Sequence, residues 1–277
     1  MSEEDVIRRT GTPLTVASLS ARLRECGLES GQTVLVHLAM SKLGWVVGGA
    51  EAVVLAMLGA VGKDGTIMMA AHSTGNTEPS TWNALPLPES WWRAFRANRP
   101  AFDPRRTPTS GMGVVPELFR TRPGAIRSDH PTYSFSARGP NAANLTGNHT
   151  LDAEMGDRAP LGKLYELDGH VLLLGVGHGN NTSLHLAESR ADFPGKTFVP
   201  MGSAMRMNGK QEWITYEAQD FDTEDFERIG MVFDRAHGID VRHINEAEVR
   251  FFRQRPLVDF AVERMERHRG VTTTARG

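Results

Sequence analysis

Several features are scarce or missing in this sequence, and each absence excludes a class of protein. The 277 residues contain a single cysteine, Cys26, so neither an intrachain disulfide nor a metal site built from several cysteines can form. No apolar run approaches the ~20 residues that a membrane-spanning helix needs. The segment Met1–Thr10 is charged and lacks the apolar core of a signal peptide. We therefore expect a soluble cytoplasmic protein without a membrane span.

An excess of charge of either sign is missing as well. The chain has 31 Lys+Arg against 33 Asp+Glu, which gives a net charge of -2. Proteins that bind nucleic acid through bulk positive charge show the opposite balance, so we expect no nucleic-acid partner. Hydrophobic residues make up 40% and charged residues 23%, as in ordinary globular proteins. The length suits one domain over residues 1–277, with a smaller lobe from about residue 195 to 277 as the alternative.

Apolar blocks alternate between helix-like and strand-like patterns in the first part of the chain. Their spacing predicts helices over 14–26 and 50–61, and buried strands over 33–37 and 66–71. This order is typical of an α/β fold with a mixed or parallel central sheet covered by helices. The patterns further predict helices over 89–98, 114–120 and 182–191, strands over 133–137 and 171–174, a hairpin of 197–205 with 212–216 around Asn208-Gly209, helices from about 223 onward, and frayed residues over 269–277.

Residues 72–112 differ from the segments around them, because they are rich in Pro, Ser, Thr, Asn and Trp. A connection of this length inside a compact protein is usually functional or disordered. Its aromatic residues argue against disorder. We therefore interpret it as an ordered, substrate-facing insertion, with a packed surface loop as the alternative.

The segment VLLLGVGHGNNTSLHLAE, residues 171–188, has the pattern of a ligand site. A buried strand runs into a glycine-rich turn, where ligands of α/β sheets gather and can approach the backbone. His185 follows in the first turns of the next helix, where the helix dipole favours a neutral imidazole. Glu188 lies on the same helix face and acts in the opposite direction. A neutral histidine suits a general base, although a packing or surface role is the common alternative.

His37, His178 and His185 could instead be the ligands of a metal-dependent hydrolase. Seven residues separate the last two histidines, and no His-x-x-x-His pair or carboxylate trio accompanies them. We therefore predict no metal and keep the hydrolase as a competing hypothesis.

Eight motifs follow one another in a set order: LVH (35–37), SKLGWVVGG (41–49), PESWW (88–92), PAFDP (100–104), TPTSGMG (107–113), RSDHP (127–131), ELDGHVLLLG (166–175) and GVGHGNNTSLHLAE (175–188). With them, residues 30–225 resemble the aminoglycoside 3-N-acetyltransferase family. The resemblance implies an α/β fold distinct from the common N-acetyltransferase superfamily, acetyl-CoA as the donor, and a cationic small-molecule amine as the acceptor. The motifs GWVVGG and PESWW are similar to a branch that includes acyltransferases of antibiotic biosynthesis, so another amine of such a pathway is the alternative acceptor.

The resemblance also implies roles for individual residues. The catalytic histidine of the family falls on His185. An acidic residue after the hairpin, Glu217 or Asp220, orients this histidine or binds the amine, and Thr182 lies near the thioester oxygen. The donor channel maps to His37, Ser41, Lys42, Leu43, Gly44, Trp45, Val46, Val47, Thr109, Ser110, Met112 and Gly113. The acceptor side maps to Glu78, Trp82, Trp92, Asp103, Asn181 and Glu188.

The sequence departs from the family pattern directly after His37. Members commonly have a Ser-Ser pair there, whereas this chain has Leu38 and Ala39. Residues 38 and 39 therefore have no hydroxyl group to contact the donor, whereas their backbone groups could still do so.

The chemistry that the resemblance implies needs few groups. Acetyl transfer to a neutral amine needs a base for the amine proton and donors for the developing oxyanion, which N–H groups of glycine-rich loops can supply. A covalent acyl-enzyme is not required, and Cys26 is expected in the core. A polycationic acceptor needs carboxylates, although the start of a solvated helix explains some of them equally well. The acidic run consists of Glu217, Asp220, Asp222, Glu224 and Asp225.

A protein that binds CoA or a nucleotide without catalysing a reaction is a further hypothesis, of a different functional class. A homodimer is a further hypothesis, although no feature of the sequence indicates it.

Overall fold

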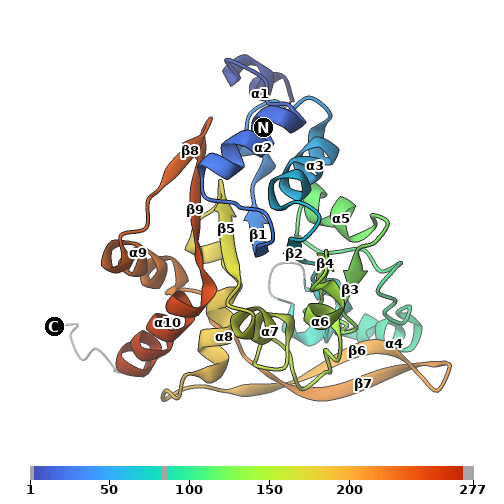
Figure 1. The fold of residues 1–277 in the computed structure, drawn as a ribbon. Helices are drawn as coiled ribbons and strands as arrows, with labels where there is room; N and C mark the ends of the chain where they lie inside the picture. The colour runs from blue at the N-terminus through green and yellow to red at the C-terminus, as the bar shows by residue number, and fades with distance from the viewer. Residues whose placement is uncertain (1–2, 83–85, 271–277) are drawn as a thin grey trace.

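The computed structural model describes residues 3–82 and 86–270. A seven-stranded sheet in the order β3-β4-β2-β1-β5-β9-β8 forms its centre (Figure 1). Three neighbouring strands run parallel: β2 (Thr66–Ala70), β1 (Thr33–Leu38) and β5 (His170–Leu174). Antiparallel pairs extend the sheet on both sides through β3 (Ile126–Arg127), β4 (Phe135–Arg138), β8 (Arg242–Ile244) and β9 (Ala247–Arg253). The prediction of a mixed or parallel sheet is confirmed, and the sheet is mixed.

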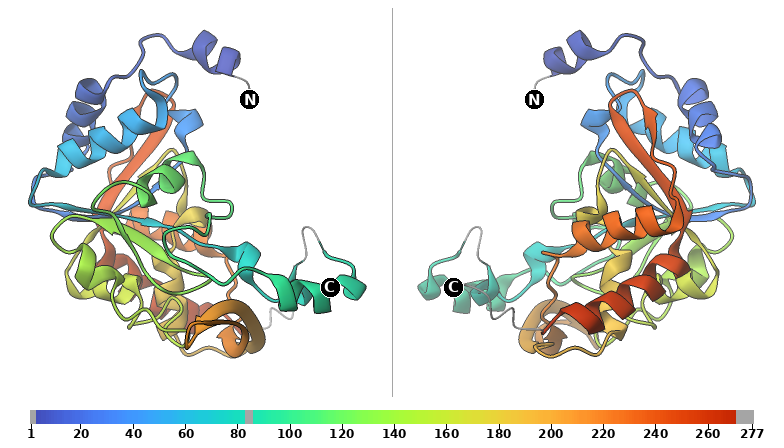
Figure 2. Two further views of the ribbon diagram at one scale, coloured as in Figure 1. Left: turned by 90° about the vertical axis from the view of Figure 1, so that its right-hand side faces the viewer. Right: turned by 90° about the vertical axis from the view of Figure 1, so that its left-hand side faces the viewer.

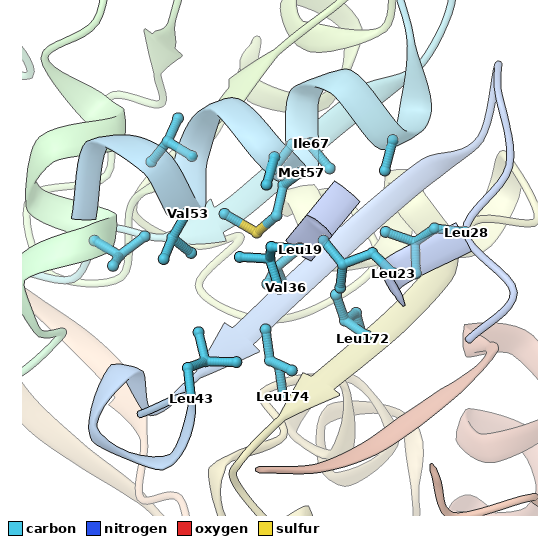
Figure 3. Packing of buried hydrophobic residues seen from close by; sticks show 14 of the residues in the cluster. Leu19, Leu23, Leu28, Val36, Leu43, Val53, Met57, Ile67, Leu172 and Leu174 are labelled. Atoms are coloured by element: carbon cyan, nitrogen blue, oxygen red, sulfur yellow. The ribbon is translucent and has the colours of Figure 1, made fainter. Parts of the chain in front are cut away.

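Both faces of the parallel strands are buried, because side chains alternate between the faces along each strand. On one face, Val36 of β1 belongs to a core that includes Leu19 and Met57 (Figure 3), as does Val34. This face is covered by α2 (Val16–Glu25), α3 (Gly49–Val61) and α5 (Val114–Arg120). On the other face, Leu35 belongs to a second core, covered by α6 (Ala142–Thr146), α7 (Pro160–Glu166), α8 (Ser183–Arg190), α9 (Phe226–His237) and α10 (Gln254–His268).

A long hairpin forms a separate two-stranded sheet beside this body. Its strands are β6 (Phe198–Met207) and β7 (Lys210–Gln219), and the turn residues Asn208 and Gly209 have φ values of 49° and 81°. Left-handed conformations at both turn positions are what an Asn-Gly hairpin turn requires, so the predicted turn is confirmed.

The insertion over residues 72–112 is ordered along its described part and packs against this hairpin. It contains the short 3-10 helices η2 (Thr74–Asn76) and η3 (Pro79–Thr81) and the helix α4 (Glu89–Asn98). The ring of Phe95 makes edge contacts with Trp82 and with Trp213 of β7, at centroid distances of 5.4 and 5.8 Å. Figure 2 shows the teal-green helix α4 projecting from one side of the molecule, beyond the orange hairpin, which is seen nearly end-on.

The structure differs from the predicted elements mainly near the ends of the chain. Helices were expected throughout the C-terminal region, but β8 and β9 interrupt them and join the central sheet. Charged residues in β9, among them Glu248 and Arg250, interrupt the apolar run by which a buried strand is recognised in a sequence. The helix α1 (Glu3–Arg9) was not anticipated. No helix among the described residues has both the length and the apolar character needed to cross a membrane.

Candidate active site

Three histidines meet where the parallel strands end at their carboxyl edge. His37 lies near the end of β1, His72 follows β2 by two residues, and His185 follows β5 after the glycine-rich turn. The carboxyl ends of parallel strands share one edge of a sheet, which is where α/β proteins bind ligands. Burial, with the nearby His185 imidazole, lowers the pKa of His37 to about 4 and that of His72 to about 3. Both rings are therefore neutral near pH 7.

A buried carboxylate holds the imidazole of His185. Nδ1 of His185 lies 3.2 Å from Oε2 of Glu188, three residues further along α8. The side chain of Glu188 is 1% exposed, whereas that of His185 is 15% exposed. The rings of Phe221 and Phe226 contact the imidazole edge-on, at centroid distances of 4.8 and 4.9 Å. With a proton on Nδ1, the ring donates to Glu188, and Nε2 remains as a proton acceptor.

Glu188 makes this contact with His185, whereas Glu217 and Asp220 were the residues expected to orient it. Both residues are exposed, and neither makes a hydrogen bond to His185 in the described structure. Glu217 lies opposite Pro200 in the hairpin, and the backbone N–H of Asp220 donates to the carbonyl of Thr197 at 3.0 Å. Helix geometry explains the difference, because residues three apart on one helix are neighbours. The role of Glu217 and Asp220 in binding an amine remains a prediction.

Thr182 and His37 are brought together beside His185. Nε2 of His37 lies 3.2 Å from Oγ1 and 3.4 Å from the backbone N of Thr182. Because His37 is neutral, its Nε2 accepts these hydrogen bonds. Thr182, whose hydroxyl was predicted to lie near the thioester oxygen, is thus held by His37, which was predicted to line the donor channel.

The glycine-rich turn is anchored from two sides. A Cβ at Gly175 would lie 2.8 Å from Cβ of Lys42, so glycine is required where the turn passes the loop after β1. His178 is fully buried, and its Nε2 lies 3.0 Å from Oδ1 of Asp234 in α9. Asn181 is also buried, and its side-chain oxygen accepts the N–H of Ser183 at 3.1 Å. Asn181 and His178 therefore fix the shape of the turn.

The metal hypothesis required His37, His178 and His185 to converge. His178 is instead paired with Asp234 and stacked on Phe252. Over residues 3–82 and 86–270, no group of His, Cys, Asp and Glu side chains has the arrangement of a metal site.

The residues predicted for the donor channel fall into two places. In the loop after β1, Ser41, Gly44, Trp45 and Val46 line a hollow of about 470 Å³. The remaining members of this loop divide into the buried Leu43 and the exposed Lys42 and Val47.

The second donor segment, residues 109–113, is tied to the histidine cluster. The backbone N–H of Ser110 donates to the carbonyl of His72 at 2.8 Å. Thr109 donates to Glu117 through its N–H and its hydroxyl, at 2.9 and 2.8 Å. Met112 packs against the second core, and Gly113 has a φ of 86°. The structure thus brings this segment next to the site, and the role of both segments toward the donor remains a prediction.

The acceptor-side residues of the insertion make contacts within the insertion itself. Glu78 forms a two-point ion pair with Arg96, with N–O distances of 3.1 and 2.5 Å. The side chain of Asp103 accepts backbone N–H groups two and three residues ahead. Trp82 donates to Thr77 at 2.8 Å and Trp92 donates to the carbonyl of Leu87 at 3.1 Å. Their role toward a substrate remains a prediction.

Comparison with known proteins identifies the family. The family model described as aminoglycoside 3-N-acetyltransferase matches residues 35–266. The chain belongs to this family.

Relatives within the aminoglycoside 3-N-acetyltransferase family match nearly the full chain. The SPbeta prophage-derived aminoglycoside N(3')-acetyltransferase-like protein YokD of Bacillus subtilis (strain 168) is 38% identical, over 92% of this chain and 94% of YokD. Its crystal structure has a TM-score of 0.93 at 37% identity, covering 96% of this chain and 98% of that one. Aminoglycoside N(3)-acetyltransferase VII of Streptomyces paromomycinus is 37% identical over 98% of both chains. The structure titled AAC-IIIb binary with CoASH has a TM-score of 0.84 at 30% identity, covering 94% of this chain and 99% of that one.

In this member of the aminoglycoside 3-N-acetyltransferase family, the two residues after His37 have few hydrogen-bond donors for a bound acetyl donor. Leu38 and Ala39 have no hydroxyl groups, and the N–H of Ala39 already donates to the carbonyl of Leu174 at 3.0 Å. The backbone contact left open by the sequence is therefore used within the sheet at Ala39. Thr182 is the hydroxyl that the structure places at this end of β1.

Sequence reasoning missed three residues of the site. His72 follows its strand as His37 ends its own, so a search for polar residues after each parallel strand would have found it. Tyr133 contacts His72 and Phe221 edge-on, at 5.8 and 6.0 Å, and burial together with nearby acidic groups raises its pKa. Arg269 was expected to be frayed, but it forms ion pairs with the site, while residues 271–277 lie outside the described residues.

Proposed function

We propose that this protein transfers the acetyl group of acetyl-CoA to the 3-amino group of 2-deoxystreptamine aminoglycosides and thereby confers resistance to them. The family and the names of its relatives support the acceptor, and the CoASH complex of AAC-IIIb supports the donor. The observation that carries the proposal is His185, which is backed by the buried Glu188 at the carboxyl edge of the parallel strands. We place the reaction in the cytoplasm.

In this proposal His185 is the general base of a direct transfer. The amine nitrogen attacks the thioester carbonyl and its proton passes to Nε2 of His185, while Nδ1–H stays bonded to Glu188. The carbon–sulfur bond then breaks, and the imidazolium returns the proton to the CoA thiolate. Glu188 stabilises the imidazolium between these steps. Positioning contributes much of the acceleration, because the thioester is already reactive.

The developing oxyanion needs donors, and Thr182 is the proposed source. In the structure its hydroxyl and N–H both donate to Nε2 of His37, which holds residue 182 at the start of α8. The proposal therefore requires the hydroxyl to turn from that ring to the thioester oxygen when the donor binds. Backbone N–H groups near the glycine-rich turn add to this field. The cationic acceptor is held by exposed carboxylates, with Glu217 and Asp220 the proposed contacts.

A thiol-release assay tests the proposal. Purified protein with acetyl-CoA and a 2-deoxystreptamine aminoglycoside is expected to release one CoA thiol per acetylated product, with the product's acetyl group on N3 by NMR. An amine panel without aminoglycosides provides the comparison. Turnover of another amine alone would move the acceptor to a biosynthetic pathway, and tight CoA binding without any turnover would make the protein a binder.

A further inference from the structure

The geometry points to Arg269 as a positioning residue that holds the carboxyl group of Glu188 in its orientation toward His185. This inference rests on the proposed function, because it concerns the base of the same site. Arg269 directly follows α10, the helix that packs beside α8 (Figure 1).

The guanidinium of Arg269 is almost fully engaged. Nη1 donates to Oε1 of Glu188 at 2.7 Å, while Nε and Nη2 donate to the two carboxylate oxygens of Asp225 at 3.0 and 2.5 Å. Nη2 also donates to the backbone carbonyl of Asp222 at 2.8 Å. The side chain is 10% exposed and lies 5.1 Å from the ring centre of Phe193. Such a planar, multiply bonded group fixes its partners more strictly than a lysine ammonium would.

These contacts divide the two oxygens of Glu188 between two tasks. Oε1 accepts from Arg269 and from the backbone N–H of Asp222, both at 2.7 Å. Oε2 is left to face Nδ1 of His185 at 3.2 Å. A carboxylate that is 1% exposed is costly to ionise without a cation nearby. Arg269 supplies that cation and sets the direction of the oxygen that His185 uses.

Other charges around the pair do not replace Arg269. Lys196 acts electrostatically with Glu188, but its ammonium is bonded to the carbonyls of Ser189 and Ala191. Tyr133 lies in the field of Glu188 and carries no charge near pH 7. His37 and His72 interact with His185 and are neutral for the reason given above.

The direction of the effect follows from Coulomb's law. Removing a cation beside the His185–Glu188 pair increases the proton affinity of the pair as a unit. The pair then takes up its proton at higher pH, and the base is blocked over a wider acidic range. The acid limb of kcat/KM against pH should therefore move to higher pH.

The experiment compares Arg269→Gln, Arg269→Lys and the control Arg267→Gln in the full chain. Arg267 lies two residues earlier and pairs with the exposed Glu263. We expect Arg269→Gln to move the acid limb up by about one pH unit, which lowers kcat/KM roughly tenfold on that limb and restores most of it at high pH. Arg269→Lys should move it far less, and Arg267→Gln should leave it in place.

A second readout does not depend on turnover. The imidazole NMR signals of His185, followed through a pH titration, should shift in the same direction and by a similar amount in Arg269→Gln. If the wild-type protein acetylates nothing, this titration still decides the role of Arg269. Equal loss of rate at all pH values, with an unmoved limb and an unmoved titration, would leave Arg269 with a structural role only and overturn the inference.

Asp225→Asn covers the case in which Arg269→Gln does not fold. This change removes an anion that shares Arg269, so the remaining pair should take up its proton at lower pH. An acid limb that stays in place or moves upward in Asp225→Asn would contradict the inference.

Discussion

Nε2 of His37 accepts hydrogen bonds from the hydroxyl and the N–H of Thr182, at 3.2 and 3.4 Å, across 145 positions of sequence. The contact joins the end of β1 to the start of α8, and so connects two of the three strands whose ends form the site. It also explains why a buried histidine occurs at the end of a strand that is otherwise apolar. Its ring is a neutral acceptor rather than a ligand or a charge.

Changes to this pair should therefore affect catalysis as a unit. We expect Thr182→Val and His37→Leu each to lower kcat by at least tenfold, toward the range seen when an oxyanion donor is removed. The double variant should lose little more than either single variant, because both changes remove the same interaction. Steady-state kinetics of the four proteins gives the comparison. Fully additive losses would mean that His37 and Thr182 act separately.

Gly230 is required by the anchor of the glycine-rich turn. A Cβ at this position of α9 would lie 1.9 Å from Cγ of the buried His178. We expect Gly230→Ala to lower the free energy of unfolding by about 2–3 kcal/mol, as overpacking of a core does. Gly59 of α3 is the matched control, since a Cβ there would meet only Oγ of Ser20 at 3.5 Å. Gly59→Ala should be neutral or stabilising by ~0.5–1 kcal/mol, and urea unfolding of both variants measures the difference.

Glu154 makes the stability of the protein depend on pH. Burial raises the pKa of its carboxyl group from 4.5 to about 7, although both oxygens accept the backbone N–H of Gln219. Between these pH values the folded chain holds a proton that the unfolded chain has released, so the free energy of unfolding decreases as the pH rises from 4.5 to about 7. The amide of Glu154→Gln keeps an acceptor for Gln219 and has no charge to bury.

At pH 8 the Glu154→Gln variant should therefore be more stable than the wild type by about 2–3 kcal/mol, with a smaller gain at pH 5. Urea unfolding at the two pH values tests this expectation. An equal gain at both values would show that Glu154 is not the group that titrates.

The buried histidines make the opposite contribution on the acid side. Burial lowers the pKa of His37 and of His149 to about 4 and that of His72 to about 3, from 6.5 in each case. Depressed folded values mean that the unfolded chain binds these protons first, so stability is present above pH 6.5 and is lost as the pH falls toward 4. We expect the unfolding free energy to fall by several kcal/mol between pH 6.5 and 5. In His149→Gln, about one proton fewer should be taken up on unfolding, so the free energy of unfolding should depend less steeply on pH. A pH dependence unchanged by that variant would contradict the assignment.

The parallel centre of the fold could be predicted because its signals are local. Residues 33–37, 66–71 and 171–174 are continuous apolar runs bounded by turns, and each corresponds to a strand of the sheet. β8 and β9 could not be predicted in the same way. Strand β9 carries Glu248, Arg250 and Arg253, and it is recognisable only from its antiparallel pairing with β5 on one side and β8 on the other.

The same limit applies to the site. His185 and the glycine-rich turn follow from neighbouring residues, and the pairing of His185 with Glu188 follows from helix spacing. Arg269 lies 81 positions from Glu188, and only the packing of α10 beside α8 brings the two together. The position of the hairpin relative to α8 is likewise not encoded in any local pattern, so the role of Glu217 and Asp220 after the hairpin remains a prediction.

The central claim is that His185 removes the proton of the incoming amine, and one kinetic comparison tests it most directly. Wild-type protein and His185→Gln are mixed with saturating acetyl-CoA and a 2-deoxystreptamine aminoglycoside, and CoA thiol release is followed, with circular dichroism and thermal unfolding as checks of the fold. The account predicts that kcat of the variant falls by roughly 10²–10⁴ while the fold is retained. A folded His185→Gln protein with the turnover of the wild type would contradict it.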